Sequence, residues 1–68
     1  MDRYKVTVYN INDDLTEEIG EGLDRDQVDA MIFGSVIVGI YEDPKKKTKT
    51  TWHLDDVSKI MYMVTREA

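Results

Sequence analysis

The only histidine of the chain, His53, is followed closely by two carboxylates, Asp55 and Asp56. A histidine beside carboxylates can hold a divalent cation or transfer a proton. A catalytic triad or a multi-histidine metal site needs further ligands, however, and the chain has one His and no Cys. We therefore interpret His53 as an exposed histidine at a strand end, and we predict no catalytic residues, no metal site and no cofactor.

Acidic residues are concentrated in the first half of the chain. Residues 1–34 contain nine acids and three bases, and residues 35–68 contain five acids and six bases, which together give the net charge of −5. Such a cluster could mimic nucleic-acid phosphate and block a DNA- or RNA-binding enzyme. The alternative is that these acids only solubilise the surface. The predicted acidic surface comprises Asp13, Asp14, Glu17, Glu18, Glu21, Asp24, Asp26 and Asp29.

Basic residues gather at one place, the segment with Lys45, Lys46, Lys47 and Lys49. Four lysines could contact a few phosphates, and this makes weak nucleic-acid binding through a lysine hairpin an alternative function. The excess of acids elsewhere opposes such binding, and lysines at a hairpin tip commonly serve solubility. We therefore do not expect nucleic acid to be the partner.

The elements that must carry these side chains are mostly strands. Alternating apolar and polar residues predict a strand over residues 3–11, and β-branched and aromatic runs predict strands over 35–42, 48–54 and 59–66. A short, frayed strand is expected over 15–23, because the two glycines in this segment would destabilise a helix. The last segment also fits helical spacing from residue 54 onward, so a C-terminal helix is the rival interpretation.

One helix is predicted from Arg25 to Phe33. Asp24 is placed to cap its N-terminus, with Gln27 completing a capping box, and Gly34 follows its last turn. Because a helix of about ten residues is unstable alone, its apolar side must pack on the sheet.

The predicted fold is therefore a single α+β domain over residues 1–68. It has a small antiparallel sheet in β-β-α-β-β-β order with one short helix on one face, and a small rolled barrel plus helix is the alternative. We expect the helix to face Val6, Val8, Val38, Ile40, Trp52 and Leu54.

One short helix covers one face only, and the other face is rich in tyrosine, isoleucine and methionine. Exposed apolar patches of this composition are typical of adaptable protein interfaces. The predicted partner-binding face carries Tyr9, Ile11, Ile37, Tyr41, Met61 and Met63.

The sequence thus predicts a non-catalytic protein-interaction module that self-associates or binds another protein. The N-terminal residues are polar and no apolar run approaches about 20 residues, so we expect a cytoplasmic protein without a membrane partner. No small-molecule substrate is expected. The small size and the absence of Cys also suit a phage or mobile-element protein that binds or inhibits a host protein.

Overall fold

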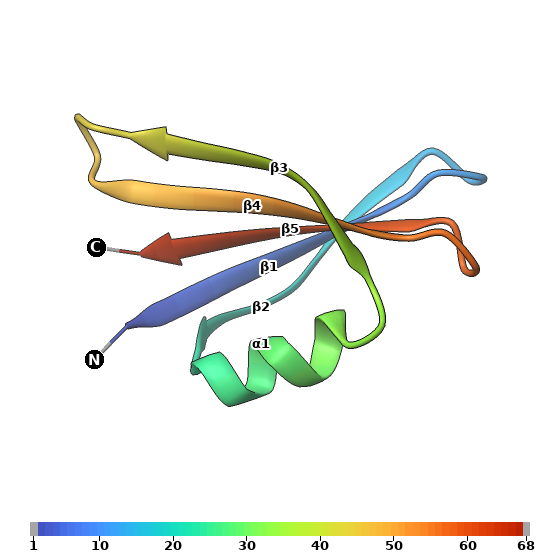
Figure 1. The fold of residues 1–68 in the computed structure, drawn as a ribbon, viewed down its shortest axis with the longest axis horizontal. Helices are drawn as coiled ribbons and strands as arrows, with labels where there is room; N and C mark the ends of the chain where they lie inside the picture. Colours follow the sequence, from blue (N-terminus) through green and yellow to red (C-terminus); the bar gives the residue numbers. More distant parts are fainter. Residues whose placement is uncertain (1, 68) are drawn as a thin grey trace.

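A computed structural model describes residues 2–67 and contains an open, five-stranded antiparallel sheet with one helix. The elements are β1 (Arg3–Asn10), β2 (Leu15–Leu23), α1 (Arg25–Ile32), β3 (Val36–Asp43), β4 (Thr48–Asp55) and β5 (Ile60–Glu67). The strand order is β2-β1-β5-β4-β3, so the first and last strands are neighbours inside the sheet (Figure 1). The predicted α+β class and element order are confirmed. The rolled-barrel and C-terminal-helix alternatives are wrong.

Each of the three hairpins turns through a four-residue loop that begins after an Asn or Asp side chain. Asn10 Oδ1 accepts a hydrogen bond from a backbone N–H of its loop, and Asp43 Oδ1 and Asp55 Oδ1 each accept two. Short polar side chains of this kind stabilise turns by replacing a backbone acceptor. The polar breaks in the sequence therefore close the hairpins where they were expected.

The helix starts at the predicted capping box. Asp24 Oδ1 accepts from the Gln27 N–H at 2.9 Å, and Gln27 Oε1 accepts from the Asp24 N–H at 2.9 Å. The helix ends at Ile32, one residue before the predicted Phe33. Gly34 has a φ of +84°, a left-handed conformation that glycine adopts without strain, and this lets the chain leave the helix for β3.

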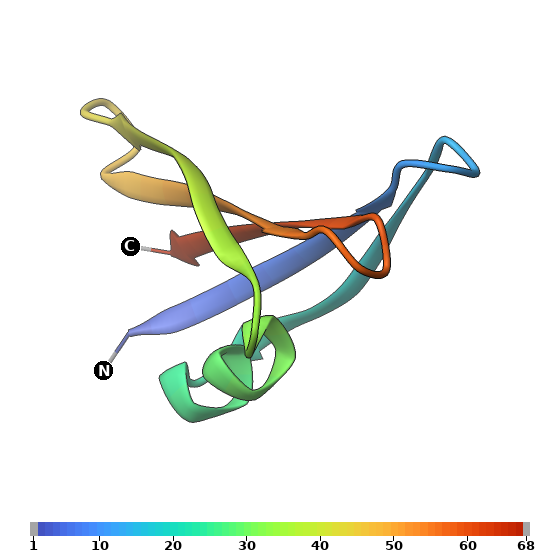
Figure 2. The same ribbon diagram turned by 45° about the vertical axis from the view of Figure 1, so that its right-hand side comes forward.

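The core is small and lies between α1 and the two central strands. Val6 of β1 is directly opposite Val64 of β5, and Val28 of α1 packs over them; their exposed fractions are 0%, 2% and 0%. Figure 2 shows the helix against one side of the sheet. The partly buried apolar residues around these three valines are Tyr4, Leu23, Met31, Ile32 and Tyr62.

The second face of the sheet has no covering layer, and it carries two residues that were expected to face the helix. Residues directly opposite each other in an antiparallel pair share a face. Trp52 is opposite Met63 and Leu54 is opposite Met61, whereas Val64 points to the helix side. The prediction for Trp52 and Leu54 was therefore wrong. The register of β4 with β5 turns Thr51 and His53 toward the helix, so Trp52 and Leu54, which alternate with them, point to the other face.

We expect the substitution Val64→Ala to lower the free energy of unfolding by about 2 kcal/mol, because it removes two buried methyl groups and leaves a cavity. Val57→Ala is the control, since Val57 is 94% exposed in the loop between β4 and β5 and its loss should change stability by less than about 0.5 kcal/mol. Urea denaturation followed by circular dichroism measures both. Equal effects of the two substitutions would contradict the assignment of the core.

Candidate functional site

The uncovered side of the sheet brings together most of the predicted partner-binding residues. We call this surface the open face and define it by Tyr9, Tyr41, Trp52, Leu54, Met61 and Met63. Tyr9 is opposite Met61, and Met63 is opposite Trp52. The Tyr9 hydroxyl donates to Asp14 Oδ1 at 2.5 Å, and this hydrogen bond to a carboxylate raises the pKa of Tyr9. The open face thus combines aromatic and methionine side chains that no helix covers.

Two of the residues predicted for this face lie elsewhere. Ile11 is in the loop between β1 and β2. Ile37 lies opposite His53 on the helix side, because a β-bulge between Ile37 and Gly39 inserts Val38 and changes the alternation of β3. Gly39 itself lies under the indole ring of Trp52, where an added Cβ would be 3.3 Å from Trp52 Cε3. A bulge is invisible in the spacing of apolar residues, and the prediction for Ile37 therefore failed.

The strand β3 is an edge of the sheet and exposes apolar side chains on both of its faces. Its exposed fractions are 65% for Val36, 51% for Ile37, 53% for Val38, 60% for Ile40 and 56% for Tyr41. No charged residue and no proline occurs between Val36 and Tyr41. Proteins usually protect an edge strand with such residues, because its free backbone N–H and C=O groups can pair with another chain. Apart from the β-bulge at Val38, this edge has no such protection from Val36 to Tyr41, so it is a candidate binding surface.

The opposite edge, β2, carries much of the predicted acidic surface. Glu17 pairs with Val8 on the helix side, whereas Glu18 pairs with Thr7 on the other side and lies 3.4 Å from the Lys5 ammonium. Asp29 of α1 forms an ion pair of 2.9 Å with Arg25. The predicted acids are therefore spread over a loop, both sides of a strand and a helix, and they do not form one row.

The lysine segment is also divided. Lys45, Lys46 and Lys47 are exposed in the loop between β3 and β4. Lys49 belongs to β4 and lies opposite Arg66 on the helix side of the sheet. The structure thus places Lys49 in the sheet beside a cation from the other end of the chain, whereas the other three lysines lie in the loop, of which Lys47 lines a second hollow together with Lys49 and Arg66.

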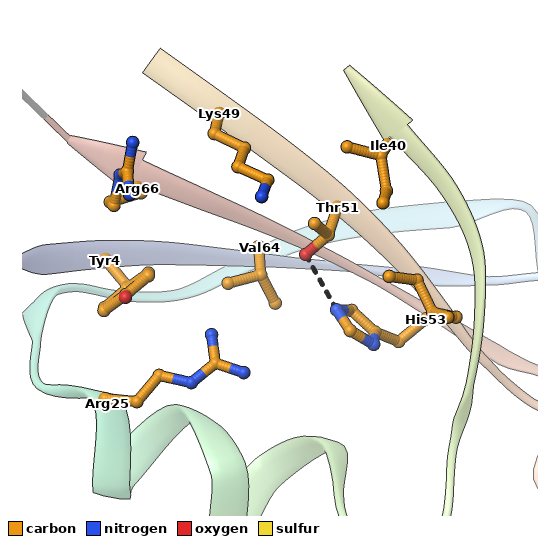
Figure 3. Close-up of a pocket in the computed structure, with 9 residues that line it drawn as sticks. Tyr4, Arg25, Ile40, Lys49, Thr51, His53, Val64 and Arg66 are labelled. Carbon is orange, nitrogen blue, oxygen red and sulfur yellow. Dashed lines mark hydrogen bonds between the residues drawn. The ribbon is translucent and has the colours of Figure 1, made fainter. Parts of the chain in front are cut away.

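His53 is buried, which corrects its interpretation as an exposed residue. Its exposed fraction is 8%, and its Nε2 lies 2.8 Å from the Thr51 hydroxyl (Figure 3). Burial lowers the pKa of His53, and the nearby positive charge of Arg25 lowers it further. Asp55, which the sequence offered as an alternative carboxylate partner, instead accepts through Oδ1 from the backbone of its own loop. The alternation of β4 was predicted correctly, but the face with Trp52 and Leu54 was expected to meet the helix, and the structure turns the face with Thr51 and His53 toward it.

Sequence reasoning also missed a pocket beside His53. Its charged lining residues are Arg25, Lys49 and Arg66, which come from α1, β4 and β5. They are far apart along the chain and no local motif joins them, so only the strand order reveals that they are close together.

Within residues 2–67, no group of three or more His, Asp or Glu side chains is placed to hold a metal ion. The one helix in this range, with eight residues, is too short to cross a bilayer. Comparisons with protein families, with curated proteins and with solved structures found no match to this chain.

We expect the stability of the protein to fall in weak acid because His53 prefers to be neutral in the fold. The unfolded chain binds this proton near the ordinary pKa of about 6.5, whereas the pKa in the fold is lower. The unfolded state therefore binds more protons between these two values, so the free energy of unfolding decreases as the pH falls through that window.

The substitution His53→Gln, which can still bond the Thr51 hydroxyl, should reduce this loss. Urea denaturation of both proteins at several pH values between about 7.5 and 5 measures it. The other titrating groups are common to both proteins and cancel in the comparison. The same pH dependence in both would show that His53 is not the responsible group.

Proposed function

We propose that this protein is a non-catalytic protein-interaction module that associates through the edge strand β3, and that its partner is a second copy of the chain. The exposure of β3 supports this proposal most directly. Five of its eight residues are large apolar side chains with more than half of their surface exposed. An added strand would pair with the free backbone groups of β3 and cover these side chains at the same time.

The two edges of the sheet differ in a way that favours β3. The edge strand β2 carries Glu17, Glu18 and Glu21. Two copies that meet at β2 would bring like charges together, which opposes association. Two copies that meet at β3 bring together uncharged residues from Val36 to Tyr41, so a chain with a net charge of −5 can self-associate there without direct repulsion.

The small core provides a reason for a second copy. Among residues 2–67 only three apolar side chains, all valines, are almost fully buried, and the chain has no Cys and hence no disulfide. A domain of about 60 residues buries only about 60% of the surface of its unfolded chain, and small domains often use oligomerisation to increase this fraction. Pairing of β3 with β3 would extend the sheet across both copies and bury apolar surface that one copy cannot cover.

Antiparallel pairing of β3 with its own copy also closes the assembly. Each strand then uses the same surface as its partner, which gives a two-fold dimer with no further free β3 edge. The open face includes Tyr41 of β3. In such a dimer the open faces of the two copies are therefore adjacent and form one apolar surface. Association of β3 with β2 of the next copy would instead grow without limit.

Sedimentation velocity should show a concentration-dependent dimer, and the substitution Val38→Lys should shift it to the monomer. Val38 is half exposed at the bulge of the edge strand, and a lysine there opposes strand pairing through its charge and hydration.

The matched control is Val57→Lys. It makes the same chemical change at a side chain that is 94% exposed in the loop between β4 and β5, away from β3, and it should remain dimeric. A monomer at every concentration for all three proteins would reject the proposed dimer. Dimers of unchanged affinity after Val38→Lys would place the contact elsewhere and also reject it.

A further inference from the structure

A pocket of about 260 Å³ lies on the helix side of the sheet, next to the core. The eight residues of α1 extend about 12 Å and pack mainly over β1, so the part of this face formed by β3 is left largely exposed, with Ile37 at 51% and Ile40 at 60%. The walls come from β1, α1, β3, β4 and β5. In Figure 3 the guanidinium of Arg25 rises from the helix toward the sheet, and the Lys49 ammonium is directed into the same space.

The pocket is positively charged in an otherwise acidic protein. Arg25, Lys49 and Arg66 line it, and no Asp or Glu is among its described lining residues. Two of these cations have a carboxylate partner outside the pocket, since Arg25 pairs closely with Asp29 at 2.9 Å and Lys49 pairs more loosely with Glu42 at 3.9 Å. Within residues 2–67, Arg66 has no carboxylate within 4.0 Å. Three cations from three elements therefore line one pocket, and two of them also contact a carboxylate outside it.

Several side chains of the pocket are held in place by contacts with one another. The Thr51 hydroxyl and His53 Nε2 are 2.8 Å apart on its floor. The guanidinium of Arg25 lies 5.5 Å from the centre of the Tyr4 ring, a cation–π contact that holds it in place. Apolar side chains of β3 form the remaining wall. The site thus combines preset hydrogen-bonding groups with space for an apolar ligand body.

We propose that this pocket binds the phosphate group of a small phosphorylated molecule. A phosphate dianion has several terminal oxygens and can engage cations on three sides at once, whereas one carboxylate is satisfied by one arginine fork. The volume is below the roughly 300–1,000 Å³ typical of pockets for drug-sized ligands, so the ligand is small. The three cations that would hold the phosphate lie in α1, β4 and β5, whereas the edge strand β3, proposed to pair in the dimer, contributes only apolar side chains to the pocket.

The test uses phenyl phosphate and inorganic phosphate as probes, at constant ionic strength, with backbone amide shifts in NMR spectra as the readout. Saturable changes should centre on Thr51, His53 and Arg66. The double substitution Lys49→Gln with Arg66→Gln should weaken binding about tenfold or more for each cation removed, because each charged hydrogen bond contributes on that scale.

The matched control is Lys45→Gln with Lys46→Gln, which removes the same charge from the exposed loop and should leave the affinity within about twofold. The unliganded spectrum of each variant reports whether it is folded. Tighter binding of phenyl phosphate supports a phosphorylated molecule as the ligand. Equal affinity for phenyl phosphate and inorganic phosphate would show that the site recognises phosphate alone, and this would reject the proposal of a phosphorylated organic molecule as the ligand. Shifts that do not saturate, or an equal loss in both double variants, would overturn the pocket as an anion site.

Discussion

Val6 lies opposite Val64, and Val28 closes over both, so three small side chains join the first strand, the last strand and the helix. This contact unites residues from the two ends of the chain in the middle of the sheet (Figure 1). Both hairpins that flank it, β1 with β2 and β4 with β5, depend on it for their position. The register of β1 on β5 also determines which side chains face the helix.

The same contact explains why so much apolar surface remains uncovered. A helix of eight residues placed over β1 cannot reach β3 at the far edge of the sheet. The apolar side chains of β3 and the open face are thus a consequence of a helix that is short relative to the sheet.

Charge is distributed according to the strand order and not according to the sequence. The acids of the first half lie mainly on the edge strand β2, on its loop and on α1. Arg25, Lys49 and Arg66 line one pocket on the helix side of the sheet, where burial favours the neutral form of His53. A negative protein can in this way contain a local positive site, because the field within a pocket depends on its nearest charges.

Most of the local structure could be predicted from the sequence. The capping box at Asp24, the turns at Asn10, Asp43 and Asp55, and the alternation of the strands all depend on residues within a few positions of one another. These interactions form in any fold that contains the segments. The α+β class followed from them, because a short amphipathic helix must pack on a sheet.

The tertiary structure alone decided which face of each strand is covered. His53 faces the helix and Trp52 lies on the open face, the reverse of what was expected. The register of β4 with β5 decides this, because a shift of one residue moves every side chain of a strand to the opposite face. The bulge at Val38 turned Ile37 toward the helix side, although the spacing in the sequence places it with Tyr41. The pocket cations come from three separate elements. Register, bulges and strand order arise from contacts between distant residues, and the sequence by itself determined the elements but not these contacts.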